Sequence, residues 1–336
     1  MKQVVSFFCF CLLLSCQPAT ERYTFSGEAF GTTYNIVVLA EETPELIPRL
    51  DSLIHSVNRS LSTYDPTSDI SRINDGAQGV VVDQMFADVF RLSQRVYEDT
   101  EGFFDPTVGP LVNAWGFGPE FVSGDREAIM DSLHQLVGFD QVLLDKQNQV
   151  SFQKKGMYLD FNAVAKGYAI DRMGYMLDQR GYANYLIEVG GEVLVKGKNT
   201  IKNSLWRIGI DDPSSGDRSQ PIRTITLTKG AMASSGNYRK FVLDSVTGQK
   251  FVHTINPITG KAQPSSTLAV SVIAPDCATA DAYATAFMAM GIERTQAWVT
   301  RQQCAGRVDE CLEVFAVYAA PDGSLLTWET PGFGTR

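Results

Sequence analysis

Two oxygen-bearing side chains in an alanine-rich stretch have a spacing that suits a metal site. Asp281 and Thr285 are four residues apart, which places them on one face of a helix, one turn from each other. A carboxylate, a hydroxyl and one or two backbone carbonyls form an all-oxygen set suited to Mg²⁺, with water and phosphate completing the octahedron. The spacing alone favours a simpler arrangement, in which the threonine bonds back to a helix carbonyl and the aspartate pairs with a lysine.

A second polar segment, residues 160–168, lies where a predicted strand turns into a helix. Free N–H groups at such a helix start favour anionic or electron-rich atoms, so the segment is a candidate ligand site. Asp160 equally suits a helix N-cap, and Lys166 equally suits a solvated side chain. The segment by itself leaves both interpretations open.

His253 is the third candidate, at the end of a short predicted strand and before a predicted tight turn at 255–260. Histidine is the side chain best suited to accept a proton near neutral pH. The other two histidines, His55 and His134, fall on predicted amphipathic helices. A single histidine is still more often structural than catalytic, so its position alone does not assign a role.

The fourth segment, residues 234–240, combines small hydroxyl side chains with two cations. It can receive a phosphate, or it can form an ordinary turn that enters a strand. The chain contains no Walker A loop, GxGxxG, HExxH or GxSxG motif, so the common nucleotide-binding and hydrolase classes lack support.

The N-terminus predicts an export signal with a lipid attachment site. After Lys2, residues 4–14 form an apolar run of about eleven residues, shorter than the roughly 20 that a membrane span needs. The run ends in a bacterial lipobox pattern at Cys16, whose acylation would anchor the chain; the alternative is an ordinary cleaved signal. We expect a signal peptide at 1–15, the lipidated cysteine and a tether at 16–22, and one soluble domain over 23–336.

Charge and cysteine content exclude two further classes. Loss of the signal removes Lys2 and moves the formal net charge from −9 to −10, which leaves no electrostatic footprint for nucleic acid. Cys277, Cys304 and Cys311 remain after processing, without CxxC spacing or nearby histidine pairs, so a zinc site is not expected. Cys304 and Cys311 are close enough in sequence for a small-loop disulfide in an oxidising compartment, and the free thiols are an equal alternative.

Hydrophobic periodicity predicts the elements that must position these residues. Helices are predicted at 45–61, 83–97, 125–137, 163–179 and 276–290. Strands are predicted at 142–144, 150–152, 157–161, 185–195, 206–210, 224–227 and 250–252, in two runs within 23–39 around a turn at Ser26-Gly27, and in a hairpin of 312–319 with 325–328. The order mixes helices and strands without strict βαβ alternation, so α+β is the predicted fold class.

Eight segments in this order resemble the ApbE family, the FAD:protein FMN transferases. They are Phe30 to Tyr34, Leu61 to Asp65, Phe104 to Gly118, Asp160 to Gly167, Val189 to Gly191, Ser234 to Gly236, His253 to Gly260 and Ala280 to Ala282. The resemblance implies a single α+β, T-fold-like domain with mixed or antiparallel sheets and packed helices, which holds FAD in a cleft.

The resemblance also implies roles for individual residues. The metal ligands for Mg²⁺ would be Asp281, Thr285 and the backbone carbonyls of Ala163 and Ala284. His253 matches the histidine thought to assist catalysis. The FAD site would be lined by Phe30, Tyr64, Phe103, Phe104, Asp105, Asp160, Lys166 and Ile255. Many relatives have Met where Phe30 stands, which should alter flavin packing without excluding it.

The implied reaction moves FMN from FAD to a Thr or Ser hydroxyl of an acceptor protein, with release of AMP. Mg²⁺ would draw charge from the phosphate oxygens, and His253 would be the general base. The aromatic rings of Tyr64 and Phe104 can stack on rings of the cofactor. Two alternatives remain: a FAD pyrophosphatase, in which water replaces the protein hydroxyl, and a non-catalytic flavin-binding lipoprotein.

By the same resemblance, the acceptor would carry a flavinylation motif of the form Asp-Gly-x-Ser/Thr-Gly-Ala-Ser/Thr. A subunit of a respiratory complex, such as the sodium-pumping NADH:quinone reductase or an Rnf-type complex, is the expected partner. We expect the lipoprotein at the inner membrane of a bacterium, facing the periplasm.

Overall fold

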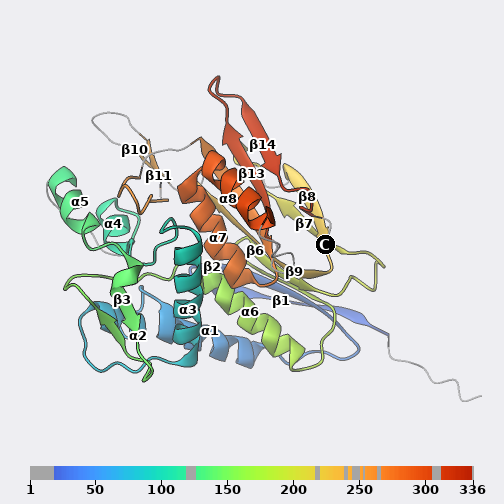
Figure 1. The fold of residues 1–336 in the computed structure, drawn as a ribbon. Helices are drawn as coiled ribbons and strands as arrows, with labels where there is room; N and C mark the ends of the chain where they lie inside the picture. Colours follow the sequence, from blue (N-terminus) through green and yellow to red (C-terminus); the bar gives the residue numbers. More distant parts are fainter. Residues whose placement is uncertain are drawn as a thin grey trace, which may run out of the picture.

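The computed structural model describes residues 19–118, 126–215, 220–237, 241–243, 250–252, 254–262, 266–304 and 312–334 (Figure 1). The strands are β1 (Glu21–Ala29), β2 (Thr32–Ala40), β3 (Val142–Leu144), β4 (Val150–Phe152), β5 (Tyr185–Val189), β6 (Glu192–Lys196), β7 (Trp206–Ile210), β8 (Arg223–Leu227), β9 (Lys229–Gly236), β10 (Phe241–Leu243), β11 (Lys250–Val252), β12 (Thr267–Ala274), β13 (Glu313–Ala319) and β14 (Leu325–Glu329). The helices are α1 (Ile47–Leu61), α2 (Asp69–Asn74), α3 (Gln84–Asp99), α4 (Gly109–Ala114), α5 (Arg126–His134), the 3₁₀ helix η1 (Phe139–Gln141), α6 (Ala165–Asp178), α7 (Cys277–Met290) and α8 (Ile292–Cys304).

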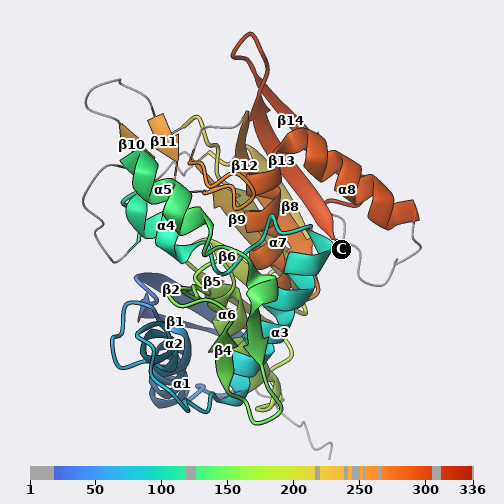
Figure 2. The ribbon, with the colours of Figure 1, turned by 60° about the vertical axis from the view of Figure 1, so that its left-hand side comes forward.

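An eight-stranded sheet organises the domain, in the order β1-β2-β5-β6-β9-β12-β13-β14. Every neighbouring pair in it is antiparallel. Figures 1 and 2 show α6 and α7 lying against one face of this sheet, and α3 and α1 beside them. The architecture confirms the α+β prediction, and the sheet pairing is antiparallel throughout.

Alternate residues of β2 show how the sheet serves two cores. Ile36 and Val38 pack with α1 and α6. Val37 and Leu39 face the other way and pack with β7 and β8, which form a separate hairpin. Because side chains alternate along a strand, an apolar run such as this one indicates a strand covered on both faces.

The predicted helices at 45–61, 83–97, 163–179 and 276–290 are confirmed, with ends shifted by a few residues. Asp83 is the N-cap of α3, as its sequence position predicts, and accepts a hydrogen bond from the N–H of Phe86 at 2.8 Å. Strand β12 and helix α8 were not predicted from the sequence. Among the described residues, no helix combines the length and the apolar character that crossing a bilayer requires.

Three predicted positions in the strand regions are wrong. The hairpin of the first two strands turns at Phe30 and Gly31 rather than at Ser26-Gly27, and β1 begins at Glu21, inside the expected tether. The single strand predicted at 185–195 is a hairpin of β5 and β6. Gly190 and Gly191 form its turn with φ of 63° and 114°, a backbone region that glycine enters without steric cost.

The strand predicted at 157–161 is also wrong, because a side chain takes the place of a neighbouring strand. The Asn74 side chain donates to the Leu159 carbonyl and accepts from the Leu159 N–H, both at 2.8 Å. The N–H of Asp160 donates to the carbonyl of Pro106 at 2.7 Å. These bonds satisfy the extended backbone without a ladder, and they fix the segment that leads into α6.

Candidate active site

Helix α7 carries three of the four expected metal ligands, Asp281, Ala284 and Thr285, of which Asp281 and Thr285 would act through their side chains. Asp276 caps its start by accepting from the N–H of Thr279 at 2.8 Å. Asp281 is only 5% exposed, and its Oδ2 accepts the N–H of Gly167 at 3.1 Å. The Thr285 hydroxyl lies 3.3 Å from the hydroxyl of Ser235 on β9. Both side chains are therefore bonded to other elements. The threonine contacts β9 in addition to its own helix, and the aspartate bonds to Gly167 while it feels the charge of Lys166 without forming a close ion pair among the described residues.

A glycine sets the distance between α6 and α7. A Cβ atom at Gly167 would lie 2.4 Å from the Cys277 carbonyl oxygen, so a side chain there would force the two helices apart. The close approach lets the first turn of α6 bond to Asp281. Ala163 lies two residues before this helix and packs at the edge of the core, and Ala284 is fully buried. If these alanines contribute to a site, they do so through backbone groups.

Three charges meet at this junction. The Lys166 ammonium lies 2.7 Å from Oε2 of Glu192, whose side chain is 5% exposed. Burial lowers the pKa of Lys166, but Glu192 and Asp281 together raise it above its ordinary value. Burial also raises the pKa of both carboxyl groups, and the charge of Lys166 opposes that rise. With all three groups ionised, the junction carries one net negative charge, which favours a bound cation.

The loop before α4 contributes buried aromatic rings. Phe103 and Phe104 are 8% and 3% exposed, and the Arg294 guanidinium lies 5.2 Å from the centre of the Phe103 ring. Asp105 accepts from the N–H and the hydroxyl of Thr107 at 2.7 and 2.5 Å. Burial raises the pKa of Asp105 to about 6. The bonds from Thr107 hold the turn of this loop, and a backbone hydrogen bond from Phe139 also favours the charged form of Asp105.

Tyr64 and Asp160 are close enough to interact electrostatically. The Tyr64 side chain is 64% exposed. Partial burial of its hydroxyl, followed by the charge of Asp160, raises the pKa of Tyr64. Oδ1 of Asp160 accepts the N–H of Asn162 at 2.7 Å, and burial raises the pKa of this carboxyl group. Asn162 also reaches Thr63 at 3.3 Å, which joins the two loops.

Phe30 and Ile255, both predicted to line the flavin site, lie on separate segments of the chain. Phe30 lies in the β1–β2 turn with a φ of 54° and packs against two of the core clusters. Ile255 is 5% exposed and packs with Leu111 of α4. Its loop is held by His134, whose Nε2 lies 2.8 Å from the Pro257 carbonyl oxygen. His134 therefore has a structural contact, at the end of the helix on which it was predicted to lie.

Several predicted positions lie outside the described residues. These are His253, Cys16, residues 238–240 of the fourth polar segment, and Cys311; the Cys304 side chain is also outside them. The residues on either side of His253 are described: Val252 is 3% exposed and ends β11, and Thr254 follows the histidine.

Sequence reasoning missed Glu192 and Asn74. Glu192 directly follows the Val189 to Gly191 motif and is the first residue of β6. Its position after two glycines and before Val193 and Val195 was the available signal, since a carboxylate at the start of an apolar strand needs a partner if that strand is buried. Asn74 closes a short helix, and its long-range bonds to Leu159 had no signal in the local sequence.

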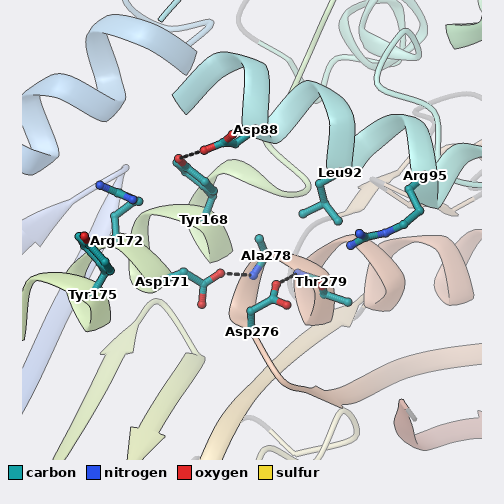
Figure 3. A pocket seen from close by; sticks show the side chains of 10 residues that line it. All are labelled: Asp88, Leu92, Arg95, Tyr168, Asp171, Arg172, Tyr175, Asp276, Ala278 and Thr279. Carbon is teal, nitrogen blue, oxygen red and sulfur yellow. Dashed lines mark hydrogen bonds between the residues drawn. The ribbon is translucent and has the colours of Figure 1, made fainter. Parts of the chain in front are cut away.

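The start of α7 is held by a second aspartate, Asp171 of α6, beside a cavity of about 370 Å³ (Figure 3). Asp171 accepts the N–H groups of Cys277 and Ala278 at 2.7 and 2.8 Å. Burial, and then the charge of Asp276, raises the pKa of Asp171 to about 7. None of the residues predicted to bind metal or FAD lines this cavity. Asp171, which does line it, positions the start of α7. A second cavity of about 420 Å³, between β2, β5 and β7, also lacks them.

The donor set of the α6–α7 junction is suited to a hard cation rather than to zinc. Within the described ranges, no three His, Cys, Asp or Glu side chains gather as a metal cluster. A site built on Asp281 and Thr285 would use one carboxylate, one hydroxyl and backbone carbonyls. Such all-oxygen sets hold Mg²⁺ together with water and phosphate. The residues present therefore fit that ion.

Comparison with known proteins identifies relatives over most of the chain. The model of the ApbE family matches residues 30–308. The FAD:protein FMN transferase of Haemophilus influenzae is 33% identical over 299 residues, which covers 84% of each chain. The FAD:protein FMN transferase of Vibrio cholerae is 35% identical over 297 residues, or 85% of this chain and 86% of the relative. The solved structure of the flavin transferase ApbE from Vibrio cholerae superposes with a TM-score of 0.80 and 31% identity, covering 94% and 99% of the two chains.

Proposed function

The chain belongs to the ApbE family, and from that membership we infer that it transfers FMN from FAD to an acceptor protein. The structural observation that supports this inference is the arrangement of charged and polar groups where α6 meets α7. There, Gly167 bonds to Asp281, and Lys166 pairs with Glu192 inside a buried, negatively charged spot. Lys166 and Gly167 are in the first turn of α6, directly after the loop that contains Asp160, and Asp160 interacts with Tyr64.

We propose that Mg²⁺ binds at this junction and is needed for the transfer. Asp281 and Thr285 would hold it with their side chains, and Ala163 and Ala284 with their carbonyls. Bound there, the ion would withdraw charge from the phosphate oxygens of FAD and orient the phosphorus for in-line attack. The net negative charge of the buried junction and its oxygen donors support this proposal.

The flavin and phosphate contacts are proposed for the residues around that ion. Lys166, at the edge of the junction, is 27% exposed and can reach a phosphate oxygen. Tyr64, exposed and beside Asp160, is free to lie over a ring of the cofactor. Phe30, Phe103, Phe104 and Ile255 supply apolar surface, and the backbone around Asp105 can supply hydrogen-bonding groups.

The acceptor would be a Thr or Ser hydroxyl, which needs to lose its proton as it attacks phosphorus. We propose His253 as the base that takes this proton, since imidazole accepts a proton near neutral pH. General base catalysis of this kind typically contributes about 10²–10⁴-fold to the rate. The bond formed is a phosphoester between FMN and the acceptor, the bond broken is the phosphoanhydride of FAD, and AMP leaves.

The lipid anchor at Cys16, an inner-membrane position facing the periplasm and a respiratory-complex acceptor remain proposals. The apolar run before Cys16 and the lipobox pattern support the first. Metabolic labelling with a radioactive fatty acid tests it: wild type should be labelled and Cys16→Ala should not. Equal labelling of the two chains would remove the anchor from the proposal.

One assay separates the proposed transfer from its two alternatives. The chain is incubated with FAD, Mg²⁺ and a peptide that carries the flavinylation motif. Peptide-bound flavin together with AMP is the expected result. Free FMN with AMP would instead identify a pyrophosphatase, and unchanged FAD would identify a flavin-binding protein without this activity.

A further inference from the structure

Lys166 lies between two buried carboxylates but pairs with only one of them. Its ammonium is 2.7 Å from Oε2 of Glu192. In the part of the chain that the structure describes, it forms no ion pair with Asp281, although the two charges interact. The bond to Gly167 occupies Oδ2 of Asp281.

This choice of partner matters because an ammonium group and a divalent cation would compete for the same carboxylate. A close ion pair between Lys166 and Asp281 would neutralise the only carboxylate among the proposed metal ligands. It would also require a cation to displace the ammonium before binding. Buried ion pairs are costly to break, since each charge is left without compensation.

The chain builds a rigid position for Glu192. It is the first residue of β6, paired in register with Val189 across the Gly190-Gly191 turn. The turn is also held by Glu188, whose Oε1 accepts the N–H of Gly191 at 2.8 Å. Glu192 is 4% exposed as a residue, so water cannot easily replace it as the partner of Lys166. Its Oε2 has no hydrogen bond of good geometry among the described residues, which leaves the ammonium as its compensating group.

We propose that Glu192 is a positioning residue that holds the Lys166 ammonium away from Asp281 and so keeps this carboxylate available for a divalent cation. The inference rests on the proposed function, because it takes Asp281 as a metal ligand. It adds a residue that touches neither the ion nor the flavin. The same pairing fixes the direction in which Lys166 can reach toward a phosphate.

Without Glu192, Asp281 is the buried carboxylate whose charge still acts on Lys166. The ammonium would turn to it, and cation binding would weaken. Loss of an outer-shell partner of a metal site typically lowers metal affinity by about 10- to 100-fold. If the weakening comes from Lys166, then removal of the lysine charge as well should reverse it. A direct structural role for Glu192 predicts no such rescue.

The test is Mg²⁺ binding to the full chain without FAD, measured by isothermal titration calorimetry, with thermal melting to verify that each variant is folded. Glu192→Gln should weaken Mg²⁺ binding by roughly 10- to 100-fold. Glu192→Asp keeps the charge but retracts the carboxylate from Lys166, and it should weaken binding as well. The double variant Glu192→Gln with Lys166→Met should bind Mg²⁺ with the wild-type affinity.

A matched control comes from the exposed pair of Lys196 and Asp178, which are 2.8 Å apart and 39% exposed each. Lys196→Met should leave Mg²⁺ binding unchanged. Wild-type affinity in Glu192→Asp would show that charge alone matters and would overturn the positioning role. A double variant as weak as Glu192→Gln would also overturn it. The proposed metal site fails separately, if Asp281→Asn binds Mg²⁺ as tightly as wild type.

Discussion

The N–H of Gly167 in α6 donates to Oδ2 of Asp281 in α7 at 3.1 Å. The bond exists because the two helices meet backbone to backbone at the Cys277 carbonyl. It fixes the candidate metal-binding carboxylate relative to the loop that carries Asp160. The position of the site thus depends on a residue that has no side chain.

Gly167→Ala should therefore reduce both stability and activity. The new methyl group would lie 2.4 Å from the Cys277 carbonyl oxygen, which belongs to rigid helix backbone. Overpacking of this kind costs about 1–3 kcal/mol of unfolding free energy. Urea unfolding measures the loss, and the flavin transfer assay measures the activity.

Gly174→Ala is the matched control on the same helix. Its Cβ would also meet an atom at 2.4 Å, but that atom is Cδ2 of Leu194, the end of a flexible side chain. This variant should lose clearly less stability than Gly167→Ala. Equal losses would contradict the importance of the backbone contact.

Asp281→Asn should abolish Mg²⁺-dependent transfer without unfolding the chain. The amide oxygen can still accept the Gly167 N–H, but the charge that would bind a cation is gone. We expect a rate loss of at least about 100-fold, which corresponds to roughly 3 kcal/mol of transition-state stabilisation. Because burial raises the pKa of Asp281, the metal-free variant should be at least as stable as wild type at neutral pH. Asp178→Asn, on the exposed side of α6, should transfer flavin normally.

Asn74→Ala should weaken the wall of the site from a distance. It removes both partners of the Leu159 backbone, whose residue is fully buried. Each unpaired buried group costs about 1–3 kcal/mol, so urea unfolding should detect a clear loss. The KM for FAD should rise, because Asp160 follows Leu159 directly. Gln78→Ala, which loses only an exposed bond to Gly76, should behave as wild type in both measurements.

Tyr64→Ala should change the fate of FMN rather than the binding of the ion. The side chain is exposed beside Asp160, where it can cover the cofactor and keep water out. We expect a several-fold increase in free FMN relative to peptide-bound FMN. Tyr64→Phe keeps the ring and should keep the wild-type ratio. Tyr175→Ala removes another exposed tyrosine, at the cavity of Figure 3, and should not alter the ratio.

The stability of the chain should depend on pH through Asp171. Its pKa is raised to about 7 in the folded state, against about 3.9 in an unfolded chain. The folded state therefore binds the proton more tightly, and this contribution is complete below about pH 4 and lost as the pH rises through about 7. The difference in unfolding free energy between wild type and Asp171→Asn should therefore decrease as the pH rises from about 4 to about 7. The decrease should be about 1.4 kcal/mol for each unit of difference between the folded and unfolded pKa. Urea unfolding at several pH values measures this difference, and a constant value would contradict the prediction.

Local sequence predicted the elements whose apolar spacing is regular, and it failed where distant groups decide. Helices such as α3 follow from periodicity and a capping aspartate. The segment at 157–161 has the composition of a strand, but its partner is the amide of Asn74 and not another strand. Glu192 was missed because its role depends on its ion pair with Lys166. The two residues are distant in sequence, and the packing of α6 on the sheet brings them together.

Motif order located most of the proposed site residues, including Asp281, Thr285 and Lys166. It did not say what holds them in place. The hydrogen bond from Gly167 to Asp281, and those from Cys277 and Ala278 to Asp171, join different helices and appear only in the folded structure. Residue types can be read along a chain, but contacts between helices of different segments cannot.

The strand order has a consequence for how such a chain can diversify. β2 pairs with β5, so the long connection between them starts and ends at adjacent points, where the Leu39 N–H donates to the Asn184 carbonyl at 3.0 Å. Tyr64, Phe103 to Asp105 and Asp160 all belong to this connection, whereas Asp281 and Thr285 follow β12. Grafting the connection from one relative into another would exchange most of the residues proposed to line the FAD site, while Phe30, Ile255, the sheet and α7 keep their own sequence.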